Sequence, residues 1–116
     1  MSGPAQSITV EGAAREEVCP YYHQAVELIG KRWTGAIVEA LLPAPRRFSE
    51  IAQAIPQISD RLLSMRLREL DGEEIVVLLV MDGSPVRVEY ALTHKGRALE
   101  PAISALRLWA REWLQP

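Results

Sequence analysis

Residues 59–70 combine hydrogen-bonding side chains with the spacing of an amphipathic helix. Leu63, Leu67 and Leu70 fall within about 60° of one another on such a helix and define its buried face. The opposite face carries Arg61, Ser64, Met65 and Arg68. Arginine can bind guanine edges through two bonds, and serine can bind bases or phosphates. This pattern alone leaves two interpretations open, a helix that fits a DNA groove and an ordinary solvated face with surface ion pairs.

Both ends of this helix carry recognisable signals. Ser59 is expected to cap a helix over residues 60–70, so that Ser59 and Asp60 form its entering end. Gly72 allows a turn at its C-terminal end. Arg66 points to the flank of the helix, which favours a structural or phosphate-binding role.

A second short helix is expected just before, with Arg46 and Arg47 at its start. Ser49 is predicted to cap it, and it runs to about Ile55 before Pro56 closes it. The exposed N–H groups and the dipole of a helix N-terminus suit a phosphate. A solvated pair of arginines is the alternative.

Cys19 is the only cysteine, so any disulfide must join two chains or include a small thiol. Cys19, His23 and Glu27 are four residues apart and could ligate a metal on one helix face. Such spacing is common by chance, and Pro20 makes the first turn irregular, so we expect no metal and no other cofactor. The chain lacks a glycine-rich phosphate loop and a set of residues typical of a catalytic triad, and we do not expect an enzyme.

Composition bounds the class of protein. The 116 residues, 48% of them hydrophobic, fit one domain with an ample core. No apolar run is long enough to span a membrane, and the N-terminus does not resemble a secretory signal, so a cytoplasmic location is expected. The net charge is −2, but Lys31 to Arg68 contain seven basic and three acidic residues. The local field, rather than the total charge, steers a polyanion.

The elements that must position these residues follow from periodicity. Residues 1–17 lack a pattern and are expected to form a flexible arm before a domain over residues 18–114. One helix is predicted over residues 21–42, ended by Pro43 and Pro45. Its apolar stripe consists of Tyr22, Val26, Ile29, Trp33, Ile37 and Leu41.

The second half of the chain predicts a hairpin and a long helix. Residues 75–81 form a β-prone run, 82–85 a turn, and 86–92 an alternating strand. Thr93 is expected to cap a helix that runs to about Leu114, with a kink near residues 97–100 caused by Pro101. Its broad apolar stripe exceeds what one small domain needs. The fold class is therefore mainly α with a small β-hairpin, a winged helix-turn-helix with an added C-terminal helix.

Several motifs, in order along residues 18–114, resemble the HxlR family of bacterial winged helix-turn-helix regulators, which are related to MarR proteins. The motifs are Cys19-Pro20, Gly30-Lys31-Arg32-Trp33-Thr34, Arg47-Phe48-Ser49-Glu50-Ile51, Ile58-Ser59-Asp60-Arg61-Leu62-Leu63-Ser64, Arg66-Leu67-Arg68-Glu69-Leu70, and Arg87-Val88-Glu89-Tyr90 with Leu92-Thr93 and Lys95-Gly96. The resemblance implies a homodimer that binds a pseudo-palindromic operator in double-stranded DNA. An unknown small-molecule effector is a further partner that this family allows.

Site residues follow from the resemblance together with the helical angles. The expected DNA contacts are Arg46, Arg47, Ser49, Ser59, Asp60, Arg61, Ser64, Met65, Arg68, Arg87 and Lys95. The expected dimer interface, formed largely by the first and the C-terminal helix, includes Tyr22, Val26, Leu106, Trp109 and Trp113. A purely intramolecular core is the alternative for that C-terminal stripe. In some members of this family a cysteine at the place of Cys19 senses oxidants or electrophiles. For Cys19 the alternative is a cysteine that only packs at the dimer interface.

The wing strand departs from the family pattern, since relatives commonly carry charged residues just after the position of Ile75. Here residues 76–81 are apolar on both faces, and a partner subunit, the arm or a ligand is expected to cover them. Two other functions stay open on this basis. One is a cysteine- or small-molecule-responsive sensor of the same fold. The other is a protein-interaction module that binds through the apolar strand, with only incidental affinity for DNA.

Overall fold

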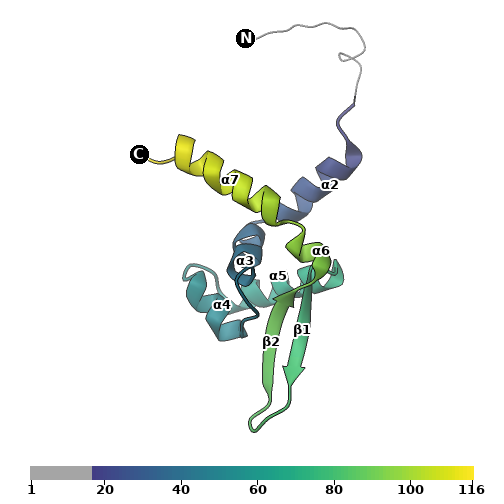
Figure 1. The fold of residues 1–116 in the computed structure, drawn as a ribbon, viewed down its shortest axis with the longest axis vertical. Coiled ribbons are helices and arrows are strands. Elements are labelled where there is room, and N and C mark those ends of the chain that lie inside the picture. Colours follow the sequence, from purple (N-terminus) through teal and green to yellow (C-terminus); the bar gives the residue numbers. More distant parts are fainter. Residues whose placement is uncertain (1–16) are drawn as a thin grey trace, which may run out of the picture. The chain divides into compact units, whose positions relative to one another are not determined.

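The structure, a computed structural model, describes residues 17–116, so the expected arm lies outside the described residues except for Glu17. The elements in chain order are α2 (Pro20–Ile29), α3 (Thr34–Leu41), α4 (Phe48–Ala54), α5 (Asp60–Gly72), β1 (Val76–Met81), β2 (Arg87–Leu92), α6 (His94–Arg97) and α7 (Glu100–Trp113) (Figure 1). Helix α2 belongs to a compact unit that ends at Gly30, and Lys31–Pro116 form a second compact unit.

The single helix predicted over residues 21–42 is wrong, because the chain breaks between α2 and α3. Gly30 closes α2 by donating its N–H to the carbonyl of Val26 at 2.7 Å. Trp33 then adopts a left-handed backbone with φ of 75° immediately before α3. A helix cannot continue through such a residue. The Arg32 guanidinium lies 5.0 Å from the centroid of the Trp33 ring, a stacked arrangement that covers part of the exposed break.

The core of the second unit forms where α3, α4, α5 and the base of the hairpin meet. Its fully buried side chains are Thr34, Ile37, Val38, Leu41, Ile51, Leu63, Leu67, Leu70 and Val76. Ile51 and Ile55 point inward from the α4 region, as their spacing predicts. This packing places α5 against β1 and leaves one face of α5 exposed to solvent.

Strands β1 and β2 form an antiparallel hairpin, which confirms the prediction with each strand starting one residue later. Figure 1 shows the hairpin projecting beyond the helices of its unit. Val76 pairs with Leu92 at the base and Met81 with Arg87 near the tip. Along β1 the apolar side chains of Val77, Leu78, Val80 and Met81 are exposed.

The predicted C-terminal helix is two helices rather than one kinked helix. The Thr93 hydroxyl accepts the Gly96 N–H at 3.0 Å, which confirms Thr93 as a cap, but the cap serves the short α6. Pro101 lies in the first turn of α7, where its missing N–H costs nothing. The break at residues 98–99 thus falls where the kink was predicted. Among residues 17–116, every helix is too short or too polar to cross a membrane.

Candidate nucleic-acid interface

Helix α5 presents an outward face of polar and basic side chains. The Ser59 hydroxyl accepts the Leu62 N–H at 3.1 Å, which confirms the predicted cap. The three leucines at positions 63, 67 and 70 are buried, also as predicted. Arg61 and Arg68 are exposed on the other side, and neither forms an ion pair with any described residue. Their guanidinium groups therefore have hydrogen-bond donors available for a ligand.

The rest of this face matches the sequence expectation in part. Ser59 and Asp60 are exposed at the N-terminal end of α5. Met65, one of the residues predicted to contact DNA, is 39% exposed although its side chain is apolar. Ser64 is half-buried and faces the side of α5 that adjoins the hairpin, where it lines a cavity.

The predicted cap of α4 is wrong, because Arg47 rather than Ser49 precedes the helix. Ser49 is the second helical residue and is exposed. The Glu50 carboxylate accepts the backbone N–H of Arg47, the N-cap residue, at 2.8 Å. A glutamate at the third helical position commonly satisfies N-terminal donors in this way. Ser49 consequently keeps its hydroxyl available at the surface.

Three arginines surround the start of α4. The pKa of Glu50 is lowered, chiefly by the hydrogen bond from the Arg47 N–H; partial desolvation opposes this, and the charges of Arg47, Arg46 and Arg87 lower it further. Arg87 comes from β2, so the wing and the start of α4 share one electrostatic neighbourhood. Arg46 also donates from Nε to the Ala40 carbonyl at 2.8 Å, which ties it to α3. Arg46, Arg47 and Arg87 form what we call the basic cluster.

Two other basic residues are engaged in holding the fold. Arg66 is only 16% exposed in its side chain and donates to the Arg32 carbonyl at 3.0 Å and to Glu69 at 3.2 Å. These bonds support the structural role expected for Arg66. The Lys95 amine donates to the Glu73 carbonyl at 2.7 Å, just after α5 ends. Sequence reasoning missed this bond, since nothing in the local pattern links residues so far apart.

A small cavity separates α5 from the hairpin. Its volume is about 210 Å³, and it is lined by Ser64, Leu67, Arg68, Asp71, Leu78 and Tyr90. Sequence reasoning identified Ser64 and Arg68 but missed Leu78 and Tyr90. Leu78 lies in a run that is apolar on both faces, and Tyr90 lies in the alternating strand. Only the pairing of Leu78 with Tyr90 across the hairpin brings them to α5.

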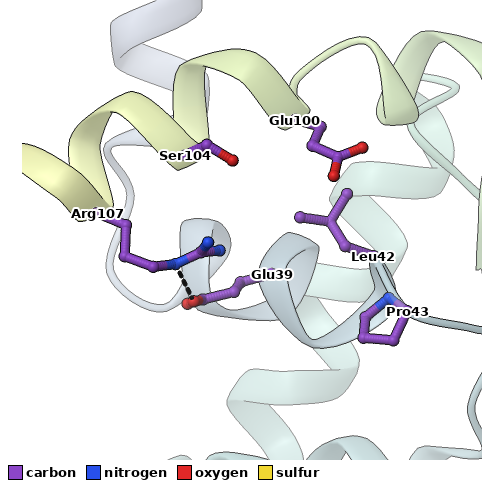
Figure 2. A pocket seen from close by; sticks show the side chains of 6 residues that line it. All are labelled: Glu39, Leu42, Pro43, Glu100, Ser104 and Arg107. Atoms are coloured by element: carbon purple, nitrogen blue, oxygen red, sulfur yellow. Dashed lines mark hydrogen bonds and ion pairs between the residues drawn. The ribbon is translucent and has the colours of Figure 1, made fainter.

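A second, open pocket of about 410 Å³ lies between α3 and α7. Figure 2 shows its lining side chains, among them Leu42, Pro43, Glu100 and Ser104. At one end Arg107 Nε lies 3.1 Å from Glu39 Oε2. This ion pair connects α7 to α3.

The residues expected at a dimer interface are exposed in the single chain. Tyr22 and Val26 on α2 are 65% and 45% exposed. On α7 the exposed fractions are 63% for Leu106, 54% for Trp109 and 67% for Trp113. The rest of the second unit thus leaves the α7 stripe exposed. Apolar surface of this size on a helix is typical of an interaction site.

Cys19 occupies the N-cap of α2 and is exposed. Its sulfur accepts the backbone N–H of Tyr22 at 3.5 Å. Within residues 17–116, no group of three or more His, Cys, Asp or Glu side chains lies close enough together to hold a metal ion.

Comparison with known proteins adds to this geometry. The model of a family described as HxlR-like helix-turn-helix matches residues 28–116. The chain is 46% identical over 102 residues to the uncharacterized HTH-type transcriptional regulator YvaP of Bacillus subtilis, covering 88% of this chain and 94% of YvaP. It is 42% identical over 99 residues to the HTH-type transcriptional regulator YodB of the same organism, covering 85% and 88%.

Solved structures show the same likeness. The reduced form of YodB matches with a TM-score of 0.77 at 42% identity, covering 86% of this chain and 98% of that structure. YodB is also known in diamide-treated and quinone-bound crystals. HypR, described as a redox regulator, matches in its reduced form with a TM-score of 0.74 at 33% identity, covering 79% of this chain and 91% of HypR.

Proposed function

The chain belongs to the HxlR family of helix-turn-helix transcriptional regulators, and from that membership we propose that it binds a pseudo-palindromic DNA operator as a homodimer. The outward face of α5 carries this proposal. Its arginines at positions 61 and 68 have no ion-pair partner among the described residues, in a helix whose opposite face is locked into the core. Such a helix can enter a major groove without disturbing the fold.

Each part of the site has its own task in this proposal. Arg61 and Arg68 contact base edges, and Ser59 with Asp60 forms the end of α5 that enters the groove. Ser64 and Met65 supply the remaining contacts of α5. The basic cluster and Ser49 hold phosphates beside the groove, as charged side chains at a helix start do. Lys95 remains a weaker phosphate contact, because its amine already binds the Glu73 carbonyl.

Dimerisation gives the site its spacing. Two copies would bury the exposed apolar side chains of α2 and α7, and would place two α5 helices about 34 Å apart in successive major grooves. Burial of apolar surface contributes roughly 25 cal/mol per Å². The exposed tryptophans of α7 therefore supply much of the driving force, which supports a dimer over a monomer.

The test is selection of duplex DNA from a random-sequence pool by the full-length protein. The proposal predicts enrichment of one inverted repeat, bound by two chains and protected over two successive major grooves. Binding should weaken steeply with added salt, because phosphate contacts release counterions. If the selected pool shows no common sequence, the alternative of a protein-interaction module with incidental DNA affinity would be favoured.

A second candidate function is a thiol-responsive switch at Cys19, in the same family frame. The supporting observation is an exposed cysteine thiol at the N-cap of α2, together with the redox and diamide descriptions of HypR and YodB. Diamide would remove two hydrogens from two Cys19 thiols, leaving an intermolecular disulfide and the hydrazine form of the reagent. If glutathione is added, diamide can instead remove one hydrogen from the Cys19 thiol and one from the glutathione thiol, which leaves a mixed disulfide.

Treatment of the DNA complex with diamide tests this second candidate. Modification of the wild type should change operator affinity, and the change should reverse with dithiothreitol. Cys19→Ser should bind the operator as the untreated wild type does and should not respond to diamide. An equal response in Cys19→Ser would exclude the thiol as the sensor.

A further inference from the structure

The cavity between α5 and the hairpin collects hydrogen-bond donors that the fold leaves unused. Ser64, Arg68 and Tyr90 all line its 210 Å³. In the part of the chain that the structure describes, none of these three side chains takes part in a hydrogen bond or an ion pair. Two hydroxyl groups and a guanidinium thus face a common space with donors to offer.

The tyrosine is held firmly in this place. Its backbone N–H donates to the Arg46 carbonyl at 2.7 Å, and its carbonyl accepts the Arg46 N–H at 2.9 Å. On the other side Tyr90 pairs with Leu78 across the hairpin. A strand residue paired on both sides keeps its side chain on one face, so the hydroxyl needs little reorganisation to bind a ligand.

The geometry of duplex DNA identifies that ligand. If α5 lies in a major groove and the projecting hairpin lies at the adjacent minor groove, the sugar–phosphate strand that separates the two grooves must pass between them. The cavity is the space between these two elements. Its donors match phosphate oxygens, which accept most hydrogen bonds at protein–DNA interfaces.

We propose that the cavity is a phosphate site, in which one phosphodiester of the operator accepts hydrogen bonds from the hydroxyls of Tyr90 and Ser64. The guanidinium of Arg68, with its five N–H donors, binds both this phosphate and the base edge beside it. Leu78, 44% exposed, packs against the neighbouring deoxyribose. Asp71 lines the part of the cavity nearer the C-terminal end of α5, and its negative charge confines the phosphate to the opposite part. The proposal rests on the proposed DNA binding by α5 and adds a residue, Tyr90, to that interface.

A conservative substitution isolates the hydroxyl. Tyr90→Phe keeps the ring, the backbone pairing and the net charge, and removes one hydrogen bond to a charged group. Operator affinity should fall about 10-fold. The slope of affinity against salt should stay unchanged, because no charge is lost. Tyr21→Phe is the matched control, since Tyr21 is 77% exposed on α2, and it should bind as the wild type does.

The decisive experiment places single methylphosphonates, which lack the phosphate charge, along an operator duplex selected by the wild type. At one phosphate per half-site, between the α5 groove and the wing groove, the substitution should weaken wild-type binding and abolish the difference between wild type and Tyr90→Phe. At other phosphates the difference should persist. Ser64→Ala should behave like Tyr90→Phe at the same phosphate.

Two results would overturn the phosphate site while leaving DNA binding intact. One is Tyr90→Phe binding the native duplex within about 2-fold of the wild type. The other is a Tyr90→Phe defect that persists at every methylphosphonate position. Failure of the wild type to select any duplex would overturn the proposed function, and the phosphate site with it.

Discussion

Basic side chains around α4 and α5 divide into those that hold the fold and those that remain available. Arg66 and Lys95 donate hydrogen bonds to backbone carbonyls, and Arg46 donates from Nε to the Ala40 carbonyl. Arg61 and Arg68 have no ion-pair partner among residues 17–116. Arg47 and Arg87 lie between the two groups, because their side chains are about half exposed but pair loosely with Glu50 at 3.9 Å and with Glu89 at 3.8 Å.

Glu50 is the residue whose ionisation the fold uses most clearly. Its pKa lies below the ordinary 4.5, first because of the hydrogen bond from Arg47. The folded state therefore binds the proton more weakly than the unfolded chain does. Ionised Glu50 adds stability above its unfolded pKa, and this stability is lost as the pH falls through the lower folded pKa.

Glu50→Gln should accordingly lower the free energy of unfolding at neutral pH. The difference from the wild type should shrink as the pH falls below the unfolded pKa of about 4.5 and through the lower folded pKa, because the wild-type carboxyl then becomes protonated as well. Urea unfolding at a series of pH values measures the loss of stability at neutral pH and its decrease at low pH. Glu112→Gln removes an exposed carboxylate of α7 that has no ion-pair partner among residues 17–116; as the control, it should leave the free energy of unfolding at neutral pH nearly unchanged. A pH-independent difference for Glu50→Gln would contradict the assignment.

At the scale of elements, periodicity predicted the parts that depend on one local pattern. Spacing along the sequence correctly predicted three features: the buried leucines of α5, its Ser59 cap and the hairpin. The break at residues 98–99 falls where Pro101 predicts a kink, whereas the break at residues 30–33 was not predicted. The apolar stripe runs through residues 30–33, and only the left-handed backbone of Trp33 reveals that two helices share it.

Long-range pairing explains what else sequence reasoning missed at the candidate site. The bridge between Arg46 and Tyr90 brings the wing to α4, and the pair Leu78 and Tyr90 faces α5. No local propensity specifies contacts between segments 44 residues apart, since these depend on how the whole chain packs. Serine prefers the N-cap position, which is why the sequence predicts Ser49 there; the helix instead begins earlier in the chain, and Glu50 accepts the backbone N–H of the N-cap residue Arg47.

The junction between α6 and β1 offers a stability test. A methyl group at Gly96 would collide with the Ile75 carbonyl and would crowd the side chains of Ile75 and Leu92. Gly96→Ala should therefore lower the free energy of unfolding by about 1–3 kcal/mol. Gly72→Ala is the matched control, because nothing lies within 4 Å of its added methyl group. Urea unfolding should show it neutral or slightly more stable, and equal losses in the two variants would contradict this packing.

At the scale of the whole molecule, the proposed dimer depends on apolar surface that the single chain leaves uncovered. Trp109→Ala combined with Trp113→Ala should raise the dimer dissociation constant by at least about 100-fold, as loss of interface tryptophans does. The fold of each chain should survive, because both rings are more than half exposed. Sedimentation velocity measures the association, and circular dichroism checks the fold.

Arg111→Ala, on the same helix, is the control for this pair and should leave the dimer intact. A double tryptophan variant that remains dimeric at the same concentration would show that another surface joins the chains. A wild type that is monomeric would contradict the dimer directly.

Sequence-specific DNA binding through α5 is the central claim, and one comparison tests it most directly. Affinity for the selected operator and for a scrambled duplex is measured for the wild type and for Arg61→Ala combined with Arg68→Ala. Arg97→Ala combined with Arg111→Ala removes the same charge elsewhere. The α5 variant should lose preference for the operator while its melting temperature stays nearly unchanged, and the control pair should keep that preference. Retention of operator preference in the α5 variant would contradict the claim.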